Sequence, residues 1–279
     1  MFEKILVLIL GGISAFLLWV DLPQLPAGPK LDLDKFELTW QDEFGGDSLD
    51  SAKWGLHGGS GVIPRRDGFW TLDVARVEGG KLYIPSFYSE DGVGDGPAGY
   101  YSLGIDTRGR FQQTYGYFEV RCKLPKGEGL WSAFWMMPNA FGTEPEDGRT
   151  GAEIDIYESA YHRDHWPKKD SVSSAVHYGG YGDNLHSQGV GRWFVSRPYD
   201  TFHTYGLEWN ADGYIFYIDG RETGRSAFGG VSQNPQWLLL SVEQVIGGWA
   251  GDISNNSPCE MTDFVIDYVR VYQYKEPAQ

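Results

Sequence analysis

Residues 151–159 read "GAEIDIYES" and place three carboxylates, Glu153, Asp155 and Glu158, in one short apolar segment. The alternation predicts a β-strand, in which side chains two positions apart share a face. Glu153 and Asp155 therefore share a face, whereas a regular strand would turn Glu158 to the other. We expect a β-bulge at Ile156 or Tyr157, because one extra residue returns Glu158 to the face of the first two acids.

Three like charges on one strand face repel each other, so the cluster indicates a chemical role. Retaining glycoside hydrolysis needs a nucleophile and an acid/base about 5–5.5 Å apart. Glu153 and Glu158 can fill these roles, and Asp155 between them can raise the pKa of the acid. Metal binding is the rival interpretation, since hard cations take clustered carboxylates. However, the isoleucine spacing fits a rigid strand better than a calcium loop.

The rest of the chain also consists of short alternating or apolar runs that end at Gly, Asp, Asn or Pro. The expected strand segments are residues 36–44, 79–87, 99–107, 115–125, 130–138, 151–159, 171–179, 200–222, 236–244 and 263–274. Asp212-Gly213 and Asp219-Gly220 are hairpin turn signals. This pattern predicts an all-β fold, a concanavalin-like β-jelly-roll sandwich of two curved antiparallel sheets with a concave substrate cleft. We expect one catalytic domain, residues 34–275.

The composition narrows the classes of partner. The 279 residues carry 23 Lys and Arg against 38 Asp and Glu, a formal net charge of −15. This field repels polyanions, so a nucleic-acid partner is not expected. Aromatic residues make up 15% of the chain, a surplus that suits stacking on sugars. The two cysteines, Cys122 and Cys259, match no metal motif, and the sequence leaves a disulfide between them open.

The N-terminal residues 5–20 form an apolar run without a charge. This run is short for a membrane span of about 20 residues and is typical of the central region of a signal peptide. We therefore expect residues 1–20 to be a signal peptide or an uncleaved anchor, and residues 21–33 to be a linker outside the domain. The protein is then secreted, periplasmic or extracellular, and it contacts a membrane only if the anchor is retained.

Several segments together resemble glycoside hydrolase family 16, which includes laminarinases, agarases and carrageenases. "EIDIYE" (153–158) resembles the bulged E-x-D-x-x-E signature of this family, "LTWQDEFGGDSLD" (38–50) its opening strand and "IDYVRVYQ" (266–273) its closing strand. The run 115–138 resembles the strand pair before the signature. The resemblance implies a β-jelly roll, endo-acting cleavage and retention of configuration. It assigns Glu153 as nucleophile, Asp155 as assisting carboxylate and Glu158 as acid/base.

The resemblance also implies further site residues. Trp131 and Trp135 match aromatic residues that line the cleft, and His177 matches a histidine that contacts substrate. Some members bind a structural Ca²⁺ away from the cleft, and Glu43, Gly80 and Asp267 occupy the matching places. No cofactor is expected for catalysis.

The sequence departs from the β-1,3-glucanases of the family in residues 238–252, where "LLLSVEQVIGGWAGD" replaces an N-L-A-V-G-G-like strand. Glu243 and Trp249 have no counterpart in that pattern, and Trp249 is a candidate substrate contact. Two basic and aromatic loops, residues 59–70 and 161–170, are also unusual. They are either solvated loops or a subsite wall that contacts a carboxylated, sulfated or galacto-configured sugar, with Arg65 and Trp70 as candidates.

The leading prediction is a monomeric, retaining endo-β-glycosidase that acts on a β-linked polysaccharide, in the first place a β-1,3-glucan. The alternative substrate is an agar- or porphyran-like galactan or a galactose-containing host glycan. Transglycosylation through the same intermediate and a lectin without activity are further possibilities. A lectin has no need of all three acids, which favours an enzyme.

Overall fold

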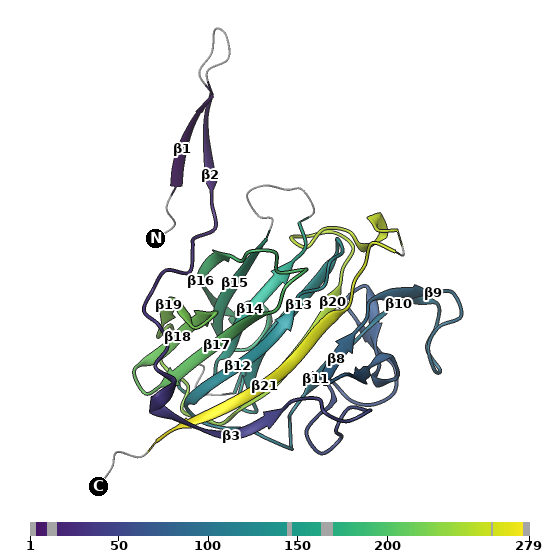
Figure 1. Ribbon diagram of the computed structural model, residues 1–279, viewed down its shortest axis with the longest axis horizontal. Helices are drawn as coiled ribbons and strands as arrows, with labels where there is room; N and C mark the ends of the chain where they lie inside the picture. The colour runs from purple at the N-terminus through teal and green to yellow at the C-terminus, as the bar shows by residue number, and fades with distance from the viewer. Residues whose placement is uncertain (1–3, 10–15, 144–146, 163–169, 258, 276–279) are drawn as a thin grey trace.

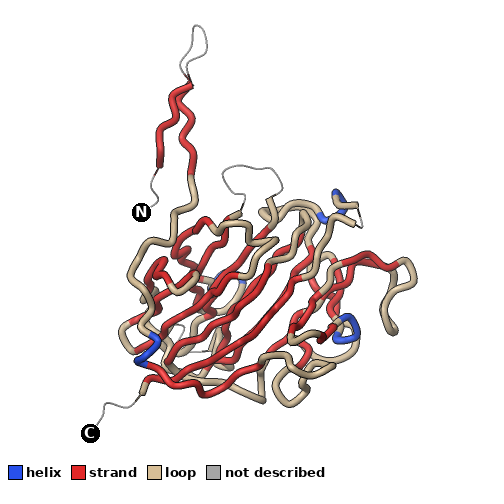
Figure 2. The backbone as a smooth tube through the Cα atoms, viewed as in Figure 1, coloured by secondary structure: helices blue, strands red, loops and turns tan. Residues whose placement is uncertain are grey.

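The computed structural model describes residues 4–9, 16–143, 147–162, 170–257 and 259–275. Two antiparallel sheets stack on each other, as Figure 1 shows. In the described residues the only helices are short 3₁₀ turns, coloured blue in Figure 2: η1 (Leu33–Lys35), η2 (Leu72–Val74), η3 (Gly182–Asn184) and η4 (Ile253–Asn255). The predicted β-jelly-roll sandwich is confirmed.

The first sheet has seven strands in the order β16 (His186–Phe194), β15 (Ser171–Tyr178), β14 (Glu153–Ala160), β13 (Leu130–Pro138), β20 (Gln236–Gln244), β11 (Gly104–Asp106) and β4 (Gly55–Leu56). The second has the order β19 (Arg221–Ser226), β18 (Gly213–Ile218), β17 (His203–Asn210), β12 (Gly116–Lys123), β21 (Phe264–Tyr274), β8 (Lys81–Ile84) and β7 (Arg76–Glu78), and β3 (Phe36–Asp42) also pairs with β21. A small third sheet contains β5 (Ile63–Arg65), β6 (Gly68–Trp70), β10 (Gly99–Ser102) and β9 (Phe87–Ser89).

Strand alternation divides the first sheet into a core face and an open face. On β13, Leu130, Phe134 and Met136 point into the core between the sheets and are at most 1% exposed. Trp135 belongs instead to a separate apolar cluster on the other face, with Ala133, Trp237 and Leu239. Aromatic side chains of the strands themselves therefore line the open face of the first sheet.

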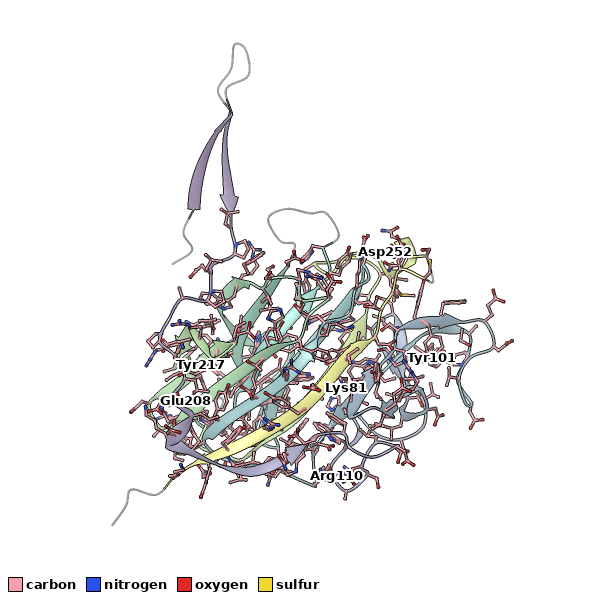
Figure 3. All side chains as sticks on the ribbon, viewed as in Figure 1. Lys81, Tyr101, Arg110, Glu208, Tyr217 and Asp252 are labelled. Atoms are coloured by element: carbon pink, nitrogen blue, oxygen red, sulfur yellow. The ribbon has the colours of Figure 1, made fainter. Side chains whose placement is uncertain are left out.

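On the outer face of the second sheet, polar side chains hydrogen-bond to one another. Tyr217 and Tyr274 donate hydrogen bonds of 2.9 and 2.8 Å to the two carboxylate oxygens of Glu208. Figure 3 labels Tyr217 and Glu208 on this layer. Because these polar groups satisfy each other, the first sheet is the better place for a binding surface.

The bulge predicted from the acidic strand is present. On the β13 side, Phe134 pairs with Tyr157 and Trp135 with Asp155, so Ile156 has no partner. On the β15 side, the register also shifts between Asp155 and Glu158, and Ser174 donates a 2.8 Å hydrogen bond to the Ile156 carbonyl. The predicted hairpin turns are confirmed as well, since β17, β18 and β19 are consecutive antiparallel strands.

Residues 21–33 differ from the prediction of a linker outside the domain. Gln24 hydrogen-bonds through its backbone to Arg192 and Phe194 of the edge strand β16, and residues 28–31 bond to residues 220–222 at the other edge strand, β19. The physical reason is that edge strands offer unpaired backbone groups. This segment therefore connects edge strand β16 of the first sheet to edge strand β19 of the second.

Of the residues before this segment, the structure describes two strands, β1 (Lys4–Ile9) and β2 (Phe16–Asp21), which pair antiparallel. No helix in the described part of the chain is long and apolar enough to cross a membrane. Cys122 is buried and Cys259 is exposed, and neither forms a disulfide.

The edge pairing of residues 24–31 can be tested by truncation. A variant that begins at residue 32 should be less stable than one that begins at residue 22, because it loses five backbone hydrogen bonds. At about 0.5–1.5 kcal/mol each, less the cost of ordering the segment, we expect a loss of about 2 kcal/mol. Thermal unfolding should show this as a fall in Tm of roughly 4–8 °C. Equal Tm values would show that the segment contributes nothing to stability.

Candidate active site

A cavity of about 390 Å³ opens on the outer face of the first sheet. Strands β13, β14 and β20 supply its floor, and the turn between β5 and β6 and the loop after β15 supply its walls. Its lining residues are Arg65, Arg66, Trp131, Ala133, Trp135, Glu153, Asp155, Glu158, Tyr181, Ser241 and Glu243. All three acids of the bulged strand therefore face one space.

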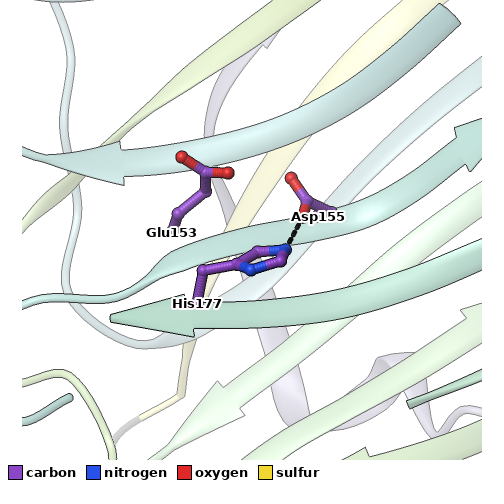
Figure 4. A group of neighbouring side chains, drawn as sticks. All are labelled: Glu153, Asp155 and His177. Atoms are coloured by element: carbon purple, nitrogen blue, oxygen red, sulfur yellow. Dashed lines mark ion pairs between the residues drawn. The ribbon is translucent and has the colours of Figure 1, made fainter. Parts of the chain in front are cut away.

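Asp155 is linked to the neighbouring strand through His177. The Nε2 atom of His177 lies 3.0 Å from Asp155 Oδ2, and its Nδ1 atom lies 2.7 Å from Ser187 Oγ. Glu153 stands directly across from His177 in the strand register. Figure 4 shows Glu153, Asp155 and His177 pointing toward one another from β14 and β15.

The donor atoms of Glu153, Asp155 and His177 lie within 4.8 Å of one another. Because His177 and Asp155 are each other's partners, we interpret the group as a hydrogen-bonded chain that fixes Asp155, not as a metal centre. His177 thus lies beside the acids, and its contact with substrate stays a prediction.

Burial changes the protonation of all three acids. Loss of water and the charge of Asp155 hold the pKa of Glu158 well above its usual range. Burial and the neighbouring Glu153 charge do the same to the pKa of Asp155. Burial also raises the pKa of Glu153, but a hydrogen bond from Tyr181 and the charges of His177, Arg65 and Arg66 oppose that rise. Glu153 is therefore the acid whose surroundings best support the charged form.

Tyr181 was not predicted as a site residue. Its hydroxyl donates a hydrogen bond to Glu153 Oε2, and its ring packs edge-on against Phe141 at 5.1 Å between centroids. Tyr181 lies in the Gly-rich stretch "YGGYGDN" after β15. The one available signal was an aromatic residue in a loop that follows the strand of His177.

The three tryptophans predicted to line the cleft, Trp131, Trp135 and Trp249, make different contacts. Trp131 donates a 3.0 Å hydrogen bond from Nε1 to Glu158 Oε1, and Trp135 donates one of 3.1 Å to Ser241 Oγ. Trp249 is 44% exposed and packs edge-on against Trp131, with 5.3 Å between ring centroids. A second hollow of about 300 Å³ begins at Glu158 and Trp249 and continues over β15 and β16. The cleft thus extends past the acids.

The prediction that Trp70 contacts substrate is wrong. Trp70 is 1% exposed and donates a 2.9 Å hydrogen bond to the Val242 carbonyl, so it belongs to the core. The small sheet of β6 packs this ring against the back of β20, which the short sequence run could not show. Arg65, in contrast, lines the cavity and lies over the Trp70 ring at 4.8 Å. In the loop 161–170, residues 163–169 lie outside the described part of the chain.

The three residues predicted to hold Ca²⁺ face other partners. Arg270 donates bonds of 2.7 and 2.9 Å to the carboxylate of Glu43. Asp267 is bonded by Arg121 and lies 3.9 Å from Lys81 Nζ, which Figure 3 labels. Gly80 lies beside the Glu43 backbone carbonyl. With both carboxylates paired to cationic side chains, this donor set does not fit a calcium ion as arranged, and the calcium site stays a prediction.

Three carboxyl groups of raised pKa share one cleft, and the surroundings of Glu153 best support a charged form. Together with the exposed indole of Trp249 beside Glu158, this arrangement is typical of a carbohydrate-cleaving site. Comparison with known proteins agrees. The profile of Glycosyl hydrolases family 16 matches residues 70–270, and the chain belongs to this family of glycoside hydrolases.

Individual relatives are similar over most of the chain. A β-glucanase from Rhodothermus marinus is 31% identical over 261 residues, which cover 86% of this chain and 86% of the relative. A keratan-sulfate endo-1,4-β-galactosidase from Sphingobacterium multivorum is 30% identical over 85% of this chain and 55% of its own length. Among solved structures, the non-specific endo-β-1,3(4)-glucanase SCLam superposes with a TM-score of 0.72 at 27% identity, covering 91% of this chain and 98% of its own.

The contact between Tyr181 and Glu153 gives a prediction that does not depend on activity. Tyr181→Phe removes a hydrogen bond that favours the charged carboxylate, so the pKa of Glu153 should rise, by up to about one pH unit. Titration of ¹³C-labelled glutamate side chains by NMR measures this change. Tyr178→Phe, whose ring stacks on His186 and does not line the cavity, is the control. An unchanged Glu153 titration would mean that Tyr181 does not tune this acid.

Proposed function

We propose that the protein is a retaining endo-β-glycosidase whose substrate is a β-glucan with 1,3 linkages. The observation that carries the proposal is the bulged strand, which brings Glu153, Asp155 and Glu158 into one cavity. The β-glucanase relative and the fold match to an endo-β-1,3(4)-glucanase support the choice of substrate. The cleft is open past Glu158, as an enzyme that cuts within a chain requires.

In the first step, Glu153 attacks the anomeric carbon and the bond to the leaving sugar breaks. Glu158 donates its proton to the departing oxygen, which its raised pKa allows. In the second step, Glu158, now a carboxylate, takes a proton from water, and the water oxygen displaces Glu153 from the anomeric carbon. Two displacements on the same carbon retain its configuration. A sugar hydroxyl in place of water would give transglycosylation, so the ratio depends on acceptor binding past Glu158.

Asp155 and His177 support this chemistry without forming a bond to the sugar. Their 3.0 Å contact fixes the carboxyl group between the two glutamates. Asp155 raises the pKa of Glu158 through its charge, so that Glu158 still holds its proton when Glu153 is ionised.

A second candidate substrate is a galactan or a galactose-containing glycan. Two arginines on the cavity wall favour it, since guanidinium groups bind oxygen-rich substituents. The keratan-sulfate galactosidase relative is consistent with it. A purely binding protein is disfavoured, because three buried acids in a cleft cost stability that sugar binding alone does not require.

The substrate is tested with a panel of laminarin, lichenan, agarose, porphyran, carrageenan and mucin glycans, with reducing-end release and product sizing. Short oligomers from laminarin are the expected result. Cleavage of a galactose polymer with no reaction on either glucan would move the substrate to the second candidate. Binding without product from any polymer would contradict the enzyme.

The catalytic roles predict the effect of two isosteric substitutions. Glu153→Gln and Glu158→Gln should each lower kcat on the preferred polymer by roughly a thousandfold or more, because each removes a group that reacts. Glu208→Gln, on the outer face of the second sheet, is the matched control and should keep full activity. Circular dichroism checks that all three variants fold. Full activity of Glu153→Gln would rule out the mechanism.

We also propose that the protein acts outside the cytoplasm, either released or held by its N-terminal segment, and as a monomer. The uncharged apolar run of residues 5–20 supports export. A polymeric substrate, which does not cross membranes, is consistent with it. N-terminal sequencing of the exported protein would show whether residues 1–20 are removed, and light scattering would give the oligomeric state.

A further inference from the structure

Two arginines stand in a cleft that otherwise carries acids, in a protein of net charge −15. They occupy the turn between β5 and β6, where Arg66 has a φ of 53°. This left-handed conformation strains a residue other than glycine and persists only where the surroundings hold it. Here Asp67 holds the turn to the end of β20: its amide donates 3.1 Å to the Gln244 carbonyl, and its carboxylate accepts 2.8 Å from the Ile246 amide.

The buried partner of both arginines is Glu243 on β20. Its side chain is 6% exposed, and Arg65 donates from Nε to Oε1 at 2.7 Å. The other oxygen, Oε2, lies 3.9 Å from Arg66 Nε and has no hydrogen-bond partner among the described residues. Two cations thus share one carboxylate, which leaves one positive charge uncompensated within the group.

Aromatic rings fix the direction of the two guanidinium groups. Arg65 lies over Trp70 at 4.8 Å, and Arg66 lies over Trp131 at 5.1 Å from the ring centroid. Both arginines line the cavity together with Glu153. The ion pair with Glu243 and the ring face beneath each guanidinium favour an orientation in which both charges lie at the cavity wall.

The other charged and titratable groups around Glu153 come from three strands and one loop. They are Asp155 and Glu158 on β14, His177 on β15, Tyr181 in the following loop and Glu243 on β20. Burial raises the pKa of Glu153, and both arginines act against that rise. The main influences on the pKa of Asp155 and Glu158 include neither arginine. The positive charge of the two arginines therefore acts mainly on Glu153 and not on Asp155 or Glu158.

We propose that Arg65, Arg66 and Glu243 are positioning residues that keep the nucleophile charged. Glu243 holds the two arginines on the cleft wall, and their net positive charge favours the carboxylate of Glu153 while Glu158 retains its proton. This rests on the proposed function, since it takes Glu153 as the nucleophile. It also gives a role to Glu243 and to Arg65 and Arg66 of the loop 59–70, which are among the unusual features of the sequence.

The test is the pH dependence of kcat/KM, whose acidic limb reports ionisation of Glu153 in the free enzyme. Arg66→Gln removes a positive charge, raises the pKa of Glu153 and should move the acidic limb up by roughly 0.5–1 pH unit. Glu243→Gln removes a negative charge while keeping an acceptor for Arg65, so the limb should move down. Loss of packing in the two variants would not be expected to move the acidic limb in opposite directions, whereas removal of opposite charges would.

Two controls separate charge from structure. Arg66→Lys keeps the charge and should leave the limb close to that of the parent, whereas Arg225→Gln removes an exposed arginine on β19 and should leave it unchanged. Tm is measured for every variant to confirm folding. An unmoved limb in Arg66→Gln, shifts of the same direction in Arg66→Gln and Glu243→Gln, or equal shifts in Arg66→Lys and Arg66→Gln would overturn the proposal. Full activity of Glu153→Gln would instead overturn the proposed function itself.

Discussion

The unpaired residue Ile156 in β14 is the constraint on which the site depends. Without it, strand parity would direct Glu158 into the core, where Phe134 and Met136 pack. With it, Glu153, Asp155 and Glu158 share the open face. The core side keeps its apolar residues, because Ile154 and Tyr157 remain buried on either side of the bulge. One added residue thus serves packing and chemistry together.

Burial raises the pKa of all three acids, and the surrounding residues oppose this rise more strongly at Glu153 than at Glu158. Loss of water raises the pKa of all three carboxyl groups, which by itself would leave the nucleophile protonated. Tyr181 and the arginine pair support charge at Glu153. At Glu158, burial and the like charge of Asp155 outweigh the hydrogen bond from the Trp131 indole N–H, which favours the charged form. The same strand therefore carries a nucleophile and an acid because different loops and strands cover its two ends.

Local periodicity was enough to predict the features that depend on neighbouring residues alone. The strands, the two hairpin turns and the bulge come from alternation and parity, and the face of Trp131 and Trp135 comes from their spacing of four. Pairs set by the tertiary fold were out of reach: Arg65 and Glu243 meet although 178 residues separate them. Trp70 was misplaced for the same reason, since packing against β20 decides its burial. Strand β16 was missed because its sequence, "HSQGVGRWF", is Gly-rich and largely exposed.

The central claim is that Glu153 and Glu158 divide nucleophilic attack and acid catalysis on a bulged strand. The stereochemistry of the first product tests it most directly. ¹H NMR during early hydrolysis of a laminarin oligomer, or of whichever polymer the enzyme cleaves, should show the β-anomer first, with the α-anomer appearing only by mutarotation. Initial formation of the α-anomer would mean direct attack by water and would contradict the account.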